Sequence, residues 1–352
     1  MKNKMEHNWN SLYIELTSRC NLHCKYCYND SSMECTESLP LNMAKQLINQ
    51  ATERNIRDIS FSGGEPLLYP HFAELFDFTT AICGRQVTLI TNASLLNLDL
   101  LDRIVATRSL LQLTLDGHTP ELHGQTRESK NFKQNLKVIQ YLRLKYQYEG
   151  IYIRINVSYH NFSFVSNTVE MLYDLGIRNI TIAIISTMGR GRICNQQNNI
   201  YDKSSLNELE LTTKLIQKKY PDLRLKYYAF GQCLGCDFYS ETGYTMNLRI
   251  RYDGAIFPCQ SFNSNGYILG NIKEIDITKN EFEDLFDNWV EEAKADKEEY
   301  LRTHCRSCYC RPFCQGGCMA YILDDPSEHI MFNTSCEMRK TYYKSKLLKA
   351  SH

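Results

Sequence analysis

Residues 17–28 read TSRCNLHCKYCY, so that Cys20, Cys24 and Cys27 stand in a C-x3-C-x2-C spacing. Three thiols on one short loop can hold only part of a metal centre, because an iron–sulfur cluster takes four thiolate ligands. A metal position that the protein leaves open is available to another molecule, as it is in catalytic zinc sites. The stretch therefore predicts a metal centre with one position left for a ligand.

A zinc site is the alternative for this stretch, because paired cysteines often bind zinc. A structural zinc site needs a fourth cysteine or histidine, and His23 is adjacent. The aromatic Tyr26 before the last cysteine and the GGEP run at residues 63–66, which follows the apolar segment 58–62, are not zinc features. The glycine pair fits an ordinary tight turn, and such a turn also lets a ligand approach the backbone.

The cysteine spacing and the GGEP run together resemble the signature of the radical SAM superfamily. This resemblance implies a [4Fe-4S] cluster on Cys20, Cys24 and Cys27, whose open iron chelates S-adenosylmethionine (SAM). It also implies that the backbone and carboxylate of the GGEP segment hold the methionine amine. The cofactor-binding residues expected on this basis are Tyr26, Gly63, Gly64, Glu65, Pro66, Thr114 and Asn156.

Composition limits the classes of protein to which the chain can belong. Its 352 residues, 43% of them hydrophobic, can bury a large core and suffice for two domains. Lys+Arg and Asp+Glu number 40 each, so no global charge attracts nucleic acid or an anionic membrane. No apolar run approaches the roughly 18 residues that span a bilayer, and the polar N-terminus lacks a signal-peptide pattern. We expect a cytoplasmic protein, in which 15 cysteines indicate metal binding rather than disulfides.

Strand-like and helix-like stretches alternate through the first two-thirds of the chain. The expected strands are Leu12–Thr17, Asp58–Ser62, Gln86–Thr91, Leu110–Asp116, Ile151–Tyr159 and Asn179–Ser186. Amphipathic stretches lie near 40–54, 70–82, 97–107, 130–147 and 163–175. A repeated βα pattern predicts an α/β fold with a parallel sheet and helices on its outer face.

The family resemblance implies that these units form a partial (β/α)6 barrel. Functional residues of parallel βα barrels lie at the C-terminal ends of the strands. The cysteine loop follows the first expected strand and the GGEP run follows the second, so we expect both at that rim. The expected domains are a radical SAM core at 1–220 and a cysteine-rich C-terminal domain at 221–352.

The fifth expected strand has one polar face, made by Arg154, Asn156 and Ser158. Barrel strands of a parallel sheet are normally apolar on both faces, so a polar face indicates a lumen that binds a ligand. Arg154 and Asn156 are therefore the candidate catalytic residues. An ion pair between Arg154 and Asp116 that simply fills the lumen is the alternative.

Two further segments resemble the family at matching positions. Thr114 and Asp116 lie in a segment similar to the family's S-x-D-G run, and in the family polar residues of this strand and the next reach the SAM ribose or carboxylate. The stretch MGRGR at 188–192 is similar to a Gly-Arg segment whose backbone lies near the adenine, although a surface turn would look the same.

A second cysteine array occupies the last third of the chain. Its spacing resembles the SPASM motif, which implies two auxiliary [4Fe-4S] clusters. The first set of ligands implied is Cys233, Cys236, Cys259 and Cys318. The second set is Cys305, Cys308, Cys314 and Cys336.

A β-hairpin turn at Tyr252–Ala255 is expected to deliver Cys259 to the first set. The gap between Cys236 and Gly254 is longer than the family usually has, which leaves open how Cys233 and Cys236 divide their roles, or whether one of them is not a ligand. The remaining cysteines are expected to be packed thiols, with substrate chemistry as a second possibility for Cys194.

The resemblance implies a radical SAM oxidoreductase of the peptide-maturase type. Such an enzyme would cleave SAM to a 5′-deoxyadenosyl radical and abstract hydrogen from a ribosomally made peptide, forming a C–C or thioether cross-link or an epimer. Tetrapyrrole side-chain modification is the alternative, and a non-catalytic electron-transfer protein is less compatible with an open iron.

Two observations narrow the substrate and the partners. Gln260 stands where anaerobic sulfatase-maturating enzymes carry an acidic base, which disfavours that activity. The first strand begins near residue 12, so we expect a peptide to need a separate leader-recognition protein or to dock directly. The expected reductant is an electron donor such as flavodoxin or ferredoxin.

Overall fold

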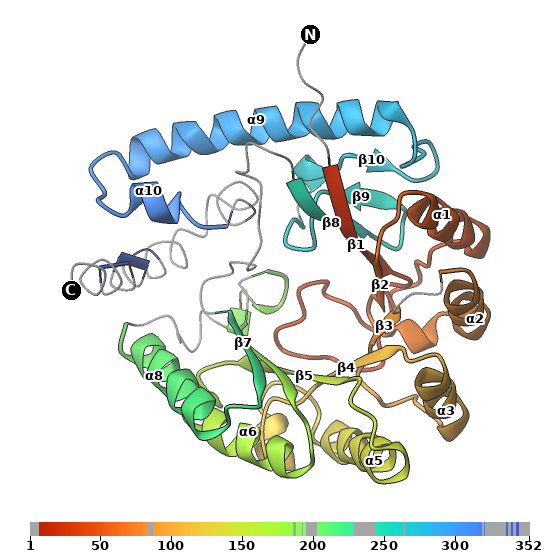
Figure 1. Cartoon of the computed structure of the whole chain (residues 1–352), viewed down its shortest axis with the longest axis vertical. Helices are drawn as coiled ribbons and strands as arrows, with labels where there is room; N and C mark the ends of the chain where they lie inside the picture. Colours follow the sequence, from red (N-terminus) through yellow and green to blue (C-terminus); the bar gives the residue numbers. More distant parts are fainter. Residues whose placement is uncertain are drawn as a thin grey trace.

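The strands of this computed structural model form one sheet of parallel and antiparallel pairs around an open barrel (Figure 1). The model describes residues 7–83, 87–185, 188–191, 193–194, 203–228, 244–263, 265–318, 320, 336, 339–340 and 343–344. The strand order is β10-β9-β8-β1-β2-β3-β4-β5-β6-β7, and the sheet does not close. The strands are β1 (His7–Glu15), β2 (Asp58–Ser62), β3 (Val87–Ile90), β4 (Leu110–Thr114), β5 (Ile151–Val157), β6 (Asn179–Ile184), β7 (Arg224–Tyr228), β8 (Tyr244–Ile250), β9 (Ala255–Phe257) and β10 (Gly270–Asn271).

Strands β1 to β7 pair in parallel, each with the next in the chain, and helices connect them. The helices of four or more residues are α1 (Leu41–Glu53), α2 (Phe72–Cys83), α3 (Leu98–Ala106), α4 (Pro120–His123), α5 (Ser129–Tyr146), α6 (Val165–Asp174), α8 (Lys203–Lys219), α9 (Asn280–His304) and α10 (Arg311–Cys314). Most of them lie outside the arc of strands, as Figure 1 shows. The predicted α/β fold with a partial barrel is confirmed.

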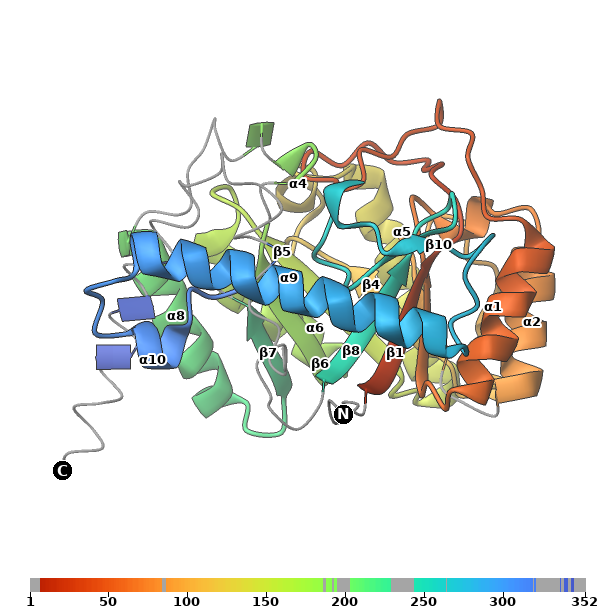
Figure 2. The ribbon, with the colours of Figure 1, turned by 90° about the horizontal axis from the view of Figure 1, so that it is seen from above.

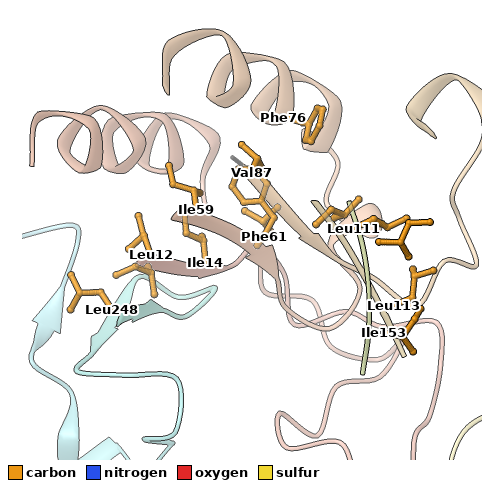
Figure 3. Close-up of a cluster of buried hydrophobic side chains, with 14 of the residues drawn as sticks. Leu12, Ile14, Ile59, Phe61, Phe76, Val87, Leu111, Leu113, Ile153 and Leu248 are labelled. Atoms are coloured by element: carbon orange, nitrogen blue, oxygen red, sulfur yellow. The ribbon is translucent and has the colours of Figure 1, made fainter. Parts of the chain in front are cut away.

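Alternating side chains divide the sheet into an apolar outer face and a polar inner face. On β5, Ile153 and Ile155 are buried in the core, whereas Arg154 between them is half-buried. Figure 3 shows the outer-face side chains, among them Phe61 and Leu111, gathered between the strands and the helices. Successive residues of a strand point to opposite faces of the sheet, so the polar residues that alternate with the core residues face the lumen.

The hairpin of β8 and β9 joins the same sheet as the barrel strands, and this attachment was not predicted from the sequence. Strand β8 pairs in parallel with β1, and β8 and β9 form the predicted antiparallel hairpin. Gly254 adopts a φ of +88° in the turn, a conformation that glycine reaches without strain. The hairpin turn was therefore predicted correctly, whereas its attachment to the first strand was not.

Helix α9 fixes the C-terminal part of the chain on the barrel. Trp9 of β1 packs against Phe282 and Phe286 of α9, with ring centroids 5.3 and 4.8 Å apart. The Trp9 indole N–H also donates to Glu283, which pairs with Arg54. In Figure 2, α9 runs lengthwise across the barrel and spans β8 and β1.

The six predicted strands and the five predicted helices are present, with ends shifted by a few residues. Helix α8, strand β7 and helix α9 were not predicted. Cys233 and Cys236 lie outside the described residues. Within the part of the chain that is described, no helix is long and apolar enough to cross a membrane.

Candidate metal and SAM site

The cysteine loop and the GGEP run meet at the C-terminal rim of the sheet, as predicted. The loop leaves β1 and, in Figure 2, lies at the same end of the barrel as α4. Two short backbone bonds join the two motifs: Gly64 N–H donates to the Thr17 carbonyl and Glu65 N–H donates to the Arg19 carbonyl, both at 2.7 Å.

The glycines are required by this close approach. Gly63 has a φ of +136°, which side-chain-bearing residues rarely adopt. A Cβ on Gly64 would lie 2.1 Å from the Arg19 carbonyl oxygen. The GGEP turn therefore supports the segment that leads directly into Cys20.

The three thiols form one partly shielded cluster with Leu22 and Tyr26. Burial raises the pKa of Cys20 to about 12, and Cys24 and Cys27 contribute to that rise. Burial likewise raises the pKa of the Cys24 thiol. Burial therefore disfavours the thiolate forms of Cys20 and Cys24, and a cationic metal centre would favour them.

Three of the four ligands that a [4Fe-4S] cluster takes can come from these thiols. Within the described residues, no three metal-ligating side chains are spaced to hold one ion. In a [4Fe-4S] cluster each thiolate binds a different iron, so the ligands stand farther apart. The donor set of three thiols is the set that leaves one iron open.

The Gly-Arg segment holds the cysteine loop in place. Arg190 donates from Nε to the Cys24 carbonyl at 2.9 Å, and its backbone N–H donates to the Cys27 carbonyl at 3.0 Å. The same guanidinium binds Asp30 and the Ser31 carbonyl. This segment is therefore not a free surface turn, and its role beside an adenine stays a prediction.

Glu65 is buried at the base of the site, 1% exposed, and its carboxylate is bound within the protein. It accepts from Thr91 Oγ1 at 2.6 Å, from the Asn92 N–H at 2.8 Å and from the Leu67 N–H at 3.2 Å. Burial raises the pKa of Glu65, and these bonds oppose the rise. The carboxylate thus ties the GGEP run to the end of β3, a contact that the sequence did not reveal.

Replacing Glu65 with Gln is expected to weaken SAM binding at least severalfold, because the amide NH2 would face backbone donors and loosen the GGEP run. Iron content should not change. Equilibrium binding of SAM to the reconstituted protein measures the effect, with Glu74→Gln on the exposed face of α2 as the matched control. Equal SAM affinity in both variants would limit Glu65 to the stability of the fold.

Asp116 organises the polar wall of the lumen. Its carboxylate accepts from Tyr26 Oη at 2.5 Å, from Thr126 Oγ1 at 3.0 Å and from the Asn156 N–H at 2.8 Å. Arg127 in turn donates to Tyr26 Oη at 3.0 Å. Tyr26 of the cysteine loop is therefore fixed by residues of the β4 and β5 ends.

The two candidate catalytic residues lie side by side on β5. Arg154 Nε donates to Asn156 Oδ1 at 2.8 Å, and the Asn156 amide donates to Tyr26 Oη at 3.1 Å. The alternative ion pair between Arg154 and Asp116 is not formed between these described side chains, and the Asp116 carboxylate accepts from Tyr26, Thr126 and the Asn156 N–H instead. Thr114, half-buried, stands opposite Arg154 in the β4–β5 register.

Sequence reasoning missed several residues that complete this region. They are Thr91 and Asn92 at the end of β3, and Arg127 after α4. Burial raises the pKa of Cys24 and of Glu65, and the positive charge of Arg127 beside the cysteine loop opposes that rise. The sequence gives no local indication of the contact between Arg127 and Tyr26, because the two residues are 101 positions apart.

The second auxiliary set is brought together as predicted. Cys305, Cys308, Cys314 and Cys336 line one pocket, and a fifth cysteine, Cys310, lines it too. Arg311, Arg339 and Lys340 complete the wall. Four thiols surrounded by positively charged side chains fit an iron–sulfur cluster, because the thiolate ligands of such a cluster carry negative charge.

The first auxiliary set is described only in part. Cys259 follows β9, and Cys318 follows α10; both pack against the main hydrophobic core. Gln260 beside Cys259 is exposed. Cys194, the remaining candidate, is 9% exposed, and burial raises its pKa, so it is not an activated thiol.

The family model of the radical SAM superfamily matches residues 14–192, about half of the chain. The chain belongs to the radical SAM superfamily. A second model, the SPASM iron-sulfur cluster-binding domain, matches residues 243–309. The three-thiol loop therefore lies in a family that binds SAM at a [4Fe-4S] cluster, and the hairpin and α9 lie in an iron–sulfur domain.

Among curated proteins, the subtilosin biosynthesis protein AlbA of Bacillus subtilis is 26% identical over 186 residues, which are 51% of this chain and 40% of AlbA. The cysteine-type anaerobic sulfatase-maturating enzyme of Clostridium novyi is 22% identical over 367 residues, covering 96% of this chain and 94% of that enzyme. The alignment with AlbA thus covers less than half of its length.

Among solved structures, Streptococcus suis SuiB bound to S-adenosylmethionine is similar in fold. The TM-score is 0.69 at 19% identity, and the match covers 93% of this chain and 76% of SuiB. SuiB has also been solved bound to its precursor peptide SuiA. The likeness shows that the two chains share a fold. The order of a radical SAM domain followed by a SPASM domain comes from the two family models.

Proposed function

We propose that this radical SAM/SPASM enzyme modifies a ribosomally made peptide, by a C–C or thioether cross-link or by epimerisation. The observation that carries the proposal is the position of the three-thiol loop, which is braced at the rim of an open barrel with a polar inner face. The cluster and SAM, when bound there, supply a 5′-deoxyadenosyl radical that can take hydrogen from an unactivated C–H bond.

Different residues of the chain would have different roles around that cofactor. Cys20, Cys24 and Cys27 would hold the cluster, and the GGEP backbone would receive the methionine end of SAM. Tyr26, fixed by Asp116 and Arg127, would orient the adjacent cysteines.

The half-buried Arg154 and the neighbouring Asn156 face the lumen from β5 and would contact the substrate or SAM. Thr114, opposite Arg154, would contact SAM from β4. A bound substrate here would exclude water from the reacting atoms.

The SPASM domain would hold two auxiliary [4Fe-4S] clusters for electron transfer. We assign Cys305, Cys308, Cys314 and Cys336 to one, since the pocket gathers them. Cys259 and Cys318 would serve the other with Cys233 and Cys236. We also propose that the boundary between the radical SAM core and the SPASM domain lies near residue 220.

A peptide substrate is supported by the relatives. AlbA acts in bacteriocin biosynthesis, and SuiB binds a precursor peptide. Sulfatase maturation, the activity of the C. novyi relative, is disfavoured because the exposed Gln260 offers no carboxylate base. We further propose that the peptide either binds through a separate leader-recognition protein or docks directly on the enzyme. The proposed electron donor is a flavodoxin or ferredoxin, and the proposed location is the cytoplasm.

Anaerobic incubation tests the substrate class. Reconstituted enzyme, SAM, a reductant and a short peptide encoded beside the gene are combined, and the peptide is analysed by mass spectrometry. A cross-link lowers the mass by about two units, and an epimerisation in deuterated water adds about one, by the hydrogen balance of radical abstraction.

The control omits SAM from the same mixture. Modification of a porphyrin precursor and of no adjacent peptide would overturn the proposal in favour of the tetrapyrrole alternative.

A further inference from the structure

A fully buried ion pair lies between the two cluster-bearing parts of the chain. Arg249 of β8 and Glu15 at the end of β1 are both 0% exposed, and the guanidinium binds the carboxylate in a fork at 3.0 and 3.1 Å. Removing two charges from water costs several kcal/mol per ion, so such a pair is weak evidence for stability. Its position therefore suggests a different role.

On one side the pair holds the loop that bears Cys27. Asn29 Nδ2 donates to Glu15 at 2.8 Å, and Arg249 donates to Asn29 Oδ1 at 3.0 Å. The Tyr28 hydroxyl also donates to Glu15, at 2.9 Å. These two residues directly follow the last cysteine of the SAM-cluster loop.

On the other side the same guanidinium holds the segment that follows Cys259. Arg249 donates to the Phe262 carbonyl at 2.7 Å and to Asn263 Oδ1 at 3.1 Å. Asn263 Nδ2 then donates to the Tyr28 carbonyl at 3.2 Å, which connects the two loops directly. We call this bonded set the inter-loop brace; its members are Glu15, Tyr28, Asn29, Arg249 and Asn263.

We propose that the inter-loop brace fixes the SAM-binding cluster relative to the first auxiliary cluster. This inference rests on the proposed function, which assigns Cys259 to that auxiliary cluster. Beyond its fork with Glu15, the Arg249 guanidinium donates to Asn29 of one loop and to Phe262 and Asn263 of the other. A shift of either loop would therefore leave a buried donor unpaired. The members are positioning residues, because they hold cluster ligands and do not themselves contact the reacting atoms.

The test uses Asn29→Ala, Asn263→Ala and the double variant in the reconstituted enzyme, and these substitutions leave the ion pair in place. Pulsed dipolar EPR of the reduced protein gives the distribution of distances between the two clusters. Each single variant should broaden it roughly twofold. The double variant should broaden it no further, because residues in one bonded path are not additive.

Asn179→Ala is the matched control, a buried asparagine at the start of β6 that binds the Glu149 and Ile151 carbonyls. It should leave the distribution unchanged. If the Asn29→Ala variant loses iron, the Tyr28→Phe variant is used in its place, because that substitution removes only one hydroxyl group. The inference is overturned when the brace variants keep the parental width, or when Asn179→Ala broadens it equally.

A second readout separates this inference from the proposed function. The brace variants should form 5′-deoxyadenosine at near the parental rate but yield severalfold less modified peptide per molecule formed. The EPR measurement needs no peptide. Failure of the parental enzyme to modify any peptide would therefore remove the proposed function, while an altered distance distribution would still support the brace.

Discussion

Replacing Cys20, Cys24 and Cys27 together with alanine is expected to abolish 5′-deoxyadenosine formation and to remove about a third of the iron, if three four-iron clusters are present. The physical reason is that these thiols converge at the barrel rim, and three thiolates would leave one iron of a four-iron cluster open. Iron analysis and product chromatography of the reconstituted variant measure both effects.

The control is Cys35→Ala, a half-buried cysteine whose thiol lies near the Ser32 hydroxyl and outside both cysteine arrays. It should retain full iron and activity. The EPR signals of the auxiliary clusters should persist in the triple variant. Reductive cleavage of SAM by the triple variant would show that the loop is not the catalytic centre.

Gly64→Ala is expected to prevent assembly of the SAM-binding cluster while the SPASM clusters remain. A Cβ at this position would lie 2.1 Å from a backbone oxygen of Arg19, so the turn or the cysteine loop must move. Loss of the Gly64 and Glu65 backbone bonds would follow. We expect at least a tenfold loss of SAM cleavage, roughly 1.4 kcal/mol or more in the barrier.

Gly150→Ala at the start of β5 is the matched control. The three atoms nearest to a Cβ at this position belong to the end of the Tyr148 side chain and not to the backbone. This variant should retain its clusters and its rate. If Gly64→Ala also retains them, the support of the cysteine loop by the GGEP turn would not be essential to the site.

The parts of the fold that were predicted depend on local patterns. Alternating residues of β5 and the turn before Ala255 can be read within a few residues, because strand periodicity and turn conformations act over that range. The pairing of β8 with β1 brings together residues more than 200 positions apart. No local pattern specifies that pairing.

The same limit separates the predicted site residues from the missed ones. Cys20 and Gly64 were recognisable because their spacing matches a family signature. Glu15 and Arg249 lie 234 residues apart, and each alone looks like an ordinary charged residue. Only the folded structure brings them together in a buried fork.

The central claim is that radical chemistry at the three-thiol loop acts on a peptide. The most direct test repeats the anaerobic incubation with the adjacent peptide synthesised from deuterated amino acids, and measures the mass of the 5′-deoxyadenosine formed. We expect a gain of about one mass unit, because the radical takes deuterium from the peptide. Unlabelled 5′-deoxyadenosine beside an unmodified peptide would contradict it.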